Sequence, residues 1–150
     1  MSNQSVLDVY DKISQWFIDS RSRDLFEKTW LDKVIMRLPP KSDILDLGCG
    51  MGEPIAKYFI DKDFVVTGVD GCSKLIEFAQ HHLENGTFLL HDMRELSLGR
   101  KFDFIIAWNS FFHLNVDDQI RMFRVFENHL RHSGLLMFTT GPKAGEVWSD

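Results

Sequence analysis

The chain has 150 residues, of which 44% are hydrophobic and 26% charged, with thirteen phenylalanines and four tryptophans. This composition supports one compact domain with a sizeable core and excludes an intrinsically disordered chain. The net charge is −5 and no cluster of Lys or Arg appears, which argues against nucleic acid as a partner. No apolar stretch is long enough to span a membrane, so we expect no membrane partner.

Two amphipathic helices are expected at the start of the chain. Apolar residues recur at helical spacing between 6 and 17 and again between 26 and 38, where Pro39 and Pro40 end the second run. The apolar positions of both runs are expected to face the body of the protein.

Five short apolar runs then alternate with helical segments. The runs cover 44–47, 64–69, 87–90, 102–107 and 135–140. Pro54 and Ser73 suit the starts of two helices, and Gly134 is expected to end a third helix with an apolar stripe of Ile120, Phe123, Phe126 and Leu130. Continuously apolar strands indicate a parallel sheet that helices cover on both faces, joined by right-handed crossovers.

A glycine turn follows the first of these strands. Asp46-Leu47-Gly48-Cys49-Gly50-Met51-Gly52 joins the strand to a helix, and the next strand ends in Asp70. Glycines at alternate positions let the backbone turn sharply and let a ligand lie against the amides. The Asp70 carboxylate can accept two hydrogen bonds from a ribose diol. This pattern predicts a nucleoside cofactor.

Nicotinamide dinucleotides and S-adenosylmethionine (SAM) both use such a turn. The dinucleotide fingerprint has its third glycine one residue later than Gly52. Asp46 places a negative charge where it would repel a pyrophosphate and attract the ammonium of a methionine. Asp92 follows the third strand, where a carboxylate can hold the adenine amino group. These features favour SAM.

These residues resemble the class I SAM-dependent methyltransferases of the small-molecule type. Val69-Asp70 is similar to the ribose-binding acid of that family and Asp92 to its adenine-side acid, while 102–107 and 130–138 resemble its fourth strand and the turn into its fifth. The resemblance implies a doubly wound, mainly parallel α/β sheet with strand order 3-2-1-4-5, helices on both faces and two leading helices. It also implies SAM as cofactor and S-adenosylhomocysteine as product.

The resemblance suggests a division of the chain. Residues 1–40 are expected to form an N-terminal helical lid or cap segment, and residues 41–150 a SAM-binding Rossmann-like domain. Relatives continue with a sixth and a seventh strand, for which 141–150 are too few. We therefore expect either a domain that is incomplete at its C-terminus, as part of a longer protein, or a homodimer that covers the open edge of the fifth strand.

The loop after the fourth strand carries the candidate catalytic residues, since ligands of open α/β sheets bind at this edge. His113 has a reference pKa of about 6.5, which suits proton removal at neutral pH. Its alternative is a polar residue that opens the next helix. Asn109 either orients the substrate or closes a turn. The resemblance implies that the backbone carbonyl of Trp108 contacts the methionine ammonium, while its side chain either stacks on the cofactor or packs in the core.

The remaining expected cofactor residues include Asp70, which has the stronger signal, and Asp92, which has a weaker one. Asp70 and Asp92 have helix or turn capping as alternatives, and Met93 would supply an amide and an apolar edge. Tyr10 resembles the aromatic residue that closes over the cofactor in relatives with a lid helix, with core packing as its alternative. The complete expected set is Asp46, Gly48, Cys49, Gly50, Gly52, Asp70, Gly71, Cys72, Asp92, Met93, Trp108 and Tyr10.

The function expected from the sequence is methyl transfer from SAM to a small molecule. The loop after the fourth strand lacks both an Asn-Pro-Pro-Tyr type sequence and a cysteine, which argues against nucleobase substrates. A non-catalytic SAM-binding or scaffold subunit and a nicotinamide-dependent oxidoreductase stay open as alternatives. Cys49 and Cys72 have no metal-site spacing, so no metal is expected, and their number fits a reducing, cytoplasmic setting.

Overall fold

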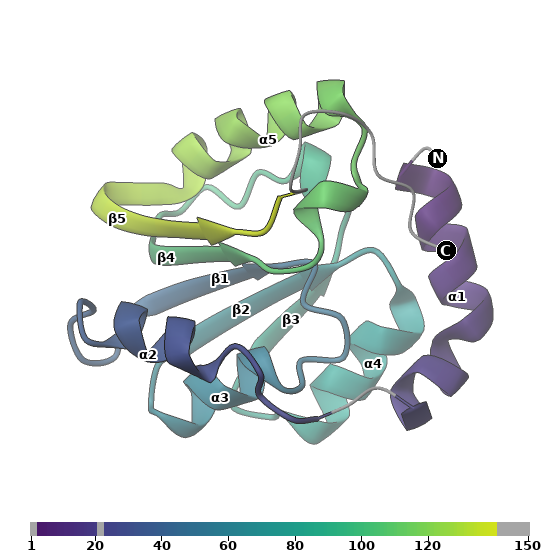
Figure 1. The fold of residues 1–150 in the computed structure, drawn as a ribbon, viewed down its shortest axis with the longest axis horizontal. Helices are drawn as coiled ribbons and strands as arrows, with labels where there is room; N and C mark the ends of the chain where they lie inside the picture. Colours follow the sequence, from purple (N-terminus) through teal and green to yellow (C-terminus); the bar gives the residue numbers. More distant parts are fainter. Residues whose placement is uncertain (1–2, 21–22, 141–150) are drawn as a thin grey trace.

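The computed structural model describes residues 3–20 and 23–140; within 3–20, side chains are described for 8, 9 and 12–20 (Figure 1). The helices are α1 (Asn3–Ser20), α2 (Lys28–Ile35), α3 (Ile55–Asp61), α4 (Ser73–His82) and α5 (Val116–His129). Two short 3-10 helices are η1 (Met93–Glu95) and η2 (Phe111–His113). The strands are β1 (Asp43–Leu47), β2 (Val65–Asp70), β3 (Thr87–Leu90), β4 (Phe102–Ala107) and β5 (Leu130–Phe138).

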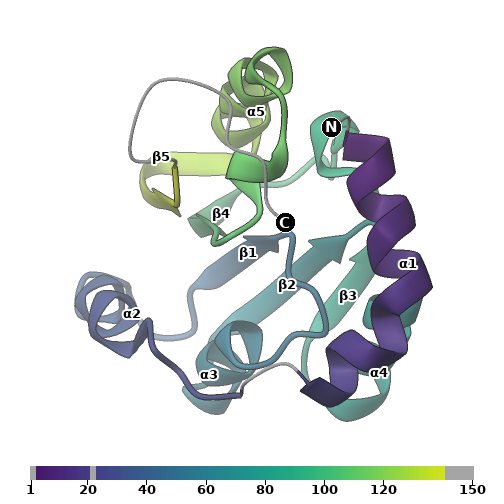
Figure 2. The same ribbon diagram turned by 45° about the vertical axis from the view of Figure 1, so that its right-hand side comes forward.

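The strands form one sheet in the order β3-β2-β1-β4-β5, and every neighbouring pair is parallel. The predicted α/β fold class and strand order are therefore confirmed. In Figure 2, β1, β2 and β3 point the same way, toward the side of the molecule where α1 lies. The strand order changes direction between β1 and β4, because β2 and β3 lie on one side of β1 and β4 and β5 on the other. Ligands of open parallel sheets bind at such a point, outside the carboxyl ends of the strands.

Each face of the sheet has its own core. On one face, α2, α3 and α4 pack on the sheet through residues such as Leu31, Phe59 and Ile76. On the other face, η2 and α5 cover Leu45, Ile105 and their neighbours. Because α2 shares the core of α3 and α4, its apolar face is part of the main packing of the sheet. The boundary at residue 40 stays a prediction.

Helix α1 packs beside α4 at the carboxyl side of the sheet (Figures 1 and 2). Among its described side chains Ser14 and Ile18 are buried, whereas Val9 and Ile13 are exposed. The expected inward face of this helix is therefore wrong at Val9 and Ile13. Ile18 belongs to a cluster with Met51 of the glycine turn and Leu75 of α4, which joins α1 to the body of the protein.

The predicted stripe of α5 is wrong in part. Ile120 is 64% exposed and Phe123 49%, while the buried face also includes the polar residues Asp118 and His129. His129 is satisfied inside the protein, because the Leu98 N–H donates to its Nε2 at 3.0 Å and its Nδ1 lies 2.7 Å from the Val125 carbonyl oxygen. Polar residues with such specific partners can occupy the inward face of a helix.

Strand β5 begins directly after α5, at Leu130, rather than after Gly134 as predicted. Its register against β4 shifts between Phe102 and Phe104, so the segment before Leu135 is irregular. Arg131 anchors this segment to the amino edge of the sheet, with Nη1 2.9 Å from both Asp103 oxygens and Nη2 2.9 Å from Asp43. At the other end of β5, Phe138 packs against Phe111, Phe123 and Phe126.

None of the helices in the described part of the chain combines the length and the apolar character needed to cross a membrane.

Candidate active site

The glycine turn after β1 is bonded to the end of β2. The amides of Gly48 and Cys49 both donate to the Val69 carbonyl, at 2.7 and 3.0 Å. A Cβ on Gly48 would lie 2.3 Å from Cβ of Ser110, so packing within the protein requires this glycine, whereas Gly52 is favoured by its left-handed φ of +85°. At Gly50, in contrast, φ is +58°, and apart from its own chain neighbours no heavy atom of the described residues lies within 4 Å of the Cβ position. The open side of the turn is therefore at Gly50.

Asp70 stands at the end of β2 and holds this turn in place. Its Oδ2 accepts from the Gly50 amide and its Oδ1 from the Cys72 amide, each at 2.9 Å. Burial raises the pKa of the Asp70 carboxyl, and the hydrogen bonds from the neighbouring amides oppose that rise. Asp70 does not cap α4, because its carboxylate accepts from the amide of Cys72, which precedes the helix; it joins this loop to Gly50.

The start of α4 differs from the expectation by one residue. Cys72 is the N-cap and Ser73 the first helical residue, and no side chain caps this end. The Cys72 side chain is buried with Met51 and Leu75. Only its backbone amide, which donates to Asp70, takes part in the local geometry of the site.

Asp46 and Cys49 are internal to the turn. Asp46 is buried within β1, which places a carboxyl group directly below the glycines. Burial, and then the charges of Asp46 and Asp70, raise the pKa of the Cys49 thiol. A protonated thiol is a poor nucleophile, so this cysteine fits the expected role of a small filler.

The end of β3 approaches the same turn. Asp92 caps η1 by accepting from the Arg94 amide at 3.0 Å, which confirms that it has a capping role. Met93 follows it, and its Cε lies 3.2 Å from the Cβ position of Gly48. Met93 therefore lies beside the glycine turn, although the two are far apart in the sequence, and Asp92 directly precedes it.

The loop after β4 closes the site on the other side. The Trp108 side chain packs against the core that contains Phe104 and Ile106, which leaves its backbone at the sheet edge. Asn109 has φ of 53°, a left-handed conformation that Asn tolerates well, and its amide donates to Thr139 Oγ1 at 2.8 Å. The turn-closing interpretation of Asn109 accounts for this backbone.

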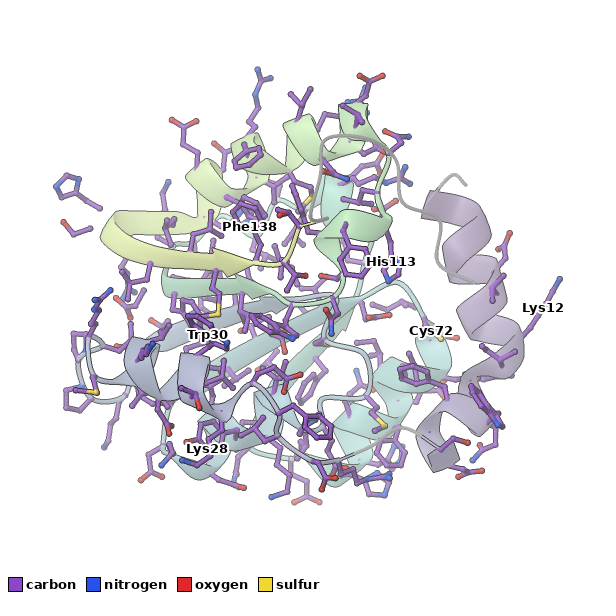
Figure 3. The ribbon with its side chains drawn as sticks, viewed as in Figure 1. Lys12, Lys28, Trp30, Cys72, His113 and Phe138 are labelled. Carbon is purple, nitrogen blue, oxygen red and sulfur yellow. The ribbon has the colours of Figure 1, made fainter. Side chains whose placement is uncertain are left out.

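His113 lies in η2 and is half-buried. Figure 3 shows it at the end of the sheet that faces α1, where the buried Cys72 also lies. Burial lowers the pKa of its imidazole, and a hydrogen bond with the Asn109 backbone partly offsets this. The ring is therefore neutral at pH 7. A neutral imidazole can accept a proton, which a general base must do.

Two further expectations concern Tyr10 and a metal site. Tyr10 is in α1, but its side chain lies outside the described residues. The described residues also include no group of three or more His, Cys, Asp or Glu side chains placed to hold a metal ion.

Two residues of the site were missed at the level of sequence. Ser110 donates from Oγ to the Leu47 carbonyl at 2.8 Å and packs on Gly48, so it ties the β4 loop to the glycine turn. Arg94 binds the Asp92 carboxylate through its guanidinium. A small polar residue following Asn109 and a cation two residues after Asp92 were the only signals for them.

A parallel sheet of this order, with a glycine turn after β1 and an acid at the end of β2, defines a Rossmann-like domain of the nucleoside-cofactor class. The family described as a methyltransferase domain matches residues 44–134. The chain belongs to the class I SAM-dependent methyltransferase family, and SAM is the cofactor that goes with this family and fold.

Individual relatives agree with this assignment. A Bacillus subtilis protein that carries the name "Putative methyltransferase YqeM" is 34% identical over 129 residues, which are 81% of this chain and 52% of that protein. A demethylmenaquinone methyltransferase of Thermotoga maritima is 29% identical over 138 residues, 86% of this chain and 58% of that protein. The chain thus spans about half the length of the curated relatives that it matches.

The fold also matches solved structures. A TehB-like SAM-dependent methyltransferase from Corynebacterium glutamicum aligns with a TM-score of 0.72 over 98% of this chain and 78% of that chain. The two sequences are 21% identical, so this similarity concerns the fold.

Proposed function

We propose that this protein binds SAM at the glycine turn and transfers its methyl group to a small molecule. The observation that carries the proposal is the open space at Gly50, next to the Asp70 carboxylate, at the carboxyl edge of the sheet. When bound, SAM supplies both the electrophilic methyl group and the leaving thioether, so the protein has to orient the acceptor and exclude water.

The proposed roles follow the positions of the residues. Asp70 accepts hydrogen bonds from the ribose, Asp46 faces the methionine ammonium, and Met93 lies along the adenine. His113 removes a proton from the acceptor where one must leave, and Asn109 shapes the adjoining turn. The Thermotoga relative is a demethylmenaquinone methyltransferase, which supports an organic acceptor of low molecular mass.

Thermal shift measurements distinguish this function from a nicotinamide-dependent oxidoreductase. S-adenosylhomocysteine at one hundred times its Kd is expected to stabilise the fold by about 2.7 kcal/mol, since it binds the folded state alone. NAD at the same concentration is expected to leave the Tm unchanged. A shift with NAD and none with S-adenosylhomocysteine would overturn the proposal.

Turnover separates an enzyme from a non-catalytic SAM-binding subunit. We expect release of S-adenosylhomocysteine from SAM with at least one acceptor in a broad metabolite panel. SAM binding measured by calorimetry, without methyl transfer to any acceptor, would favour the scaffold alternative.

His113→Ala is expected to lower kcat by about 10²–10⁴-fold, the usual contribution of a general base to the rate. The Kd for S-adenosylhomocysteine should stay within about twofold, because the imidazole acts on the acceptor and not on the cofactor. In the parent protein, kcat should rise with pH through a pKa below 6.5 and level off by neutral pH, since burial lowers the pKa of the base. His91→Ala, on an exposed histidine after β3, is the control. An unchanged rate and pH profile in His113→Ala would return His113 to a structural role.

We also propose that β5 pairs with a second copy of the chain. Within the described residues β5 has a single neighbour, β4, so its other edge offers backbone hydrogen-bonding groups. Light scattering is expected to give the mass of a dimer, and a monomer at every concentration would contradict this.

The cytoplasmic location and the absence of a nucleic-acid partner stay predictions, and the two free cysteines support a reducing compartment.

A further inference from the structure

The Asp92 carboxylate is bound by its own neighbour, Arg94. Nε of Arg94 lies 3.1 and 3.2 Å from the two carboxylate oxygens, and Nη2 lies 2.6 Å from Oδ2. The Arg94 backbone amide donates to Oδ1 at 3.0 Å as well. A carboxylate offers about four acceptor positions. Arg94 therefore occupies most of the acceptor positions with which the Asp92 carboxylate could bind a ligand.

A second carboxylate fixes Arg94 in this position. Its Nη1 donates to Asp118 Oδ2 at 3.0 Å, and the Asp118 side chain, in the first turn of α5, is only 8% exposed. Asn115 caps this turn by accepting from the Asp118 amide at 2.8 Å. The side chains of Arg94 and Asp92 are 23% and 24% exposed, so both are largely sheltered from water.

This arrangement is too strong for a neutral amine to displace. An arginine that donates parallel hydrogen bonds to a carboxylate binds it more strongly than an uncharged N–H does. The hydrogen bonds from Arg94 lower the pKa of Asp92, and those to Asp92 and Asp118 raise the pKa of Arg94, so both groups stay charged. Removal of Arg94 from Asp92 would also leave Asp118 buried without its closest cation.

We propose that Arg94 is a positioning residue that sets base specificity: by holding the Asp92 carboxylate, it removes the acceptor that would read the six-amino group of adenine. The purine is then held by Met93 and by its shape, and the six-amino group adds little to the affinity. This inference rests on the proposed function, because it assumes that the nucleoside lies beside Asp92 and Met93.

The test compares S-adenosylhomocysteine with its analogue that carries unsubstituted purine in place of adenine, which lacks the six-amino group and keeps N1 as an acceptor. Calorimetry is expected to give Kd values within about threefold of each other for the parent protein. In Arg94→Met the carboxylate is released, and the preference for the adenosine ligand should grow by about tenfold to over a hundredfold, the value of a hydrogen bond to a charged group. A general loss of stability would weaken the binding of both ligands equally and leave the ratio of the two Kd values unchanged.

Two further variants complete the experiment. The double variant Arg94→Met, Asp118→Asn also removes the buried negative charge of Asp118. It replaces the single variant in the measurement if that variant fails to fold. Arg121→Met removes an exposed arginine 3.9 Å from Asp118 and should leave the ratio as in the parent. A parent preference above about a hundredfold, or an unchanged ratio in a folded Arg94 variant, would overturn the inference. Failure of the parent to bind either ligand would instead overturn the proposed function, and this inference with it.

Discussion

Replacement of Gly50 by valine is expected to abolish S-adenosylhomocysteine binding while the domain stays folded. In the part of the chain that the structure describes, no heavy atom beyond the chain neighbours of Gly50 lies within 4 Å of the Cβ position, so we expect a side chain there to meet the space that the cofactor would fill. A branched residue at φ of +58° is strained, by about 1–3 kcal/mol. A domain with a stability of about 5–15 kcal/mol tolerates that loss. Calorimetry measures the binding, and circular dichroism the fold.

Gly99→Val is the matched control for this experiment. Gly99 also has a left-handed backbone, with φ of +68°, and no atom lies within 4 Å of its Cβ position. It precedes β4, at the edge of the sheet opposite the site. The two variants should therefore lose similar stability, and only Gly50→Val should lose the ligand. Normal binding by Gly50→Val would show that the turn does not cradle the cofactor.

The sheet and its functional edge were predictable because their signals are local. Each strand is a short apolar run that ends in a polar or glycine residue, and parallel order brings these ends to one edge. Asp70, Gly50 and Met93 could therefore be placed together from the sequence. The same reasoning could not show that Asp70 also accepts the Gly50 and Cys72 amides, because that depends on the turn geometry.

The missed features depend on partners that are distant in the chain. Asp118 and His129 look like exposed positions of α5, but Arg94 and the Leu98 amide satisfy them on its buried face. Ile120 and Phe123 offered an equally regular apolar stripe, so periodicity alone favoured the wrong side. Ser110 was missed for the same reason, since its role appears only when the β4 loop meets Gly48.

Replacement of Asp70 by alanine is expected to weaken S-adenosylhomocysteine binding strongly. The ribose of the ligand would lose the carboxylate that accepts its hydrogen bonds, and the Gly50 amide would lose the acceptor that holds the turn. Hydrogen bonds to a charged group are worth about 1.5–3 kcal/mol, so Kd should rise by about tenfold to over a hundredfold. Asp103→Ala is the control, because Asp103 also accepts a backbone amide, that of Asp43, but at the opposite edge of the sheet.

The pH dependence of this affinity gives a second, independent measurement. Burial raises the pKa of Asp70 above its usual value, so the folded protein binds a proton there at a higher pH than the unfolded chain does. The part of the stability that comes from this pKa shift is therefore present at acidic pH and is lost as the pH rises through the folded-state pKa. Ligand affinity has the opposite trend: it should fall as the pH is lowered through the same pKa, since a protonated acid is a weaker acceptor. In Asp70→Ala that fall should disappear, and a parent Kd that does not change between neutral and acidic pH would contradict the assignment of Asp70 to the ribose.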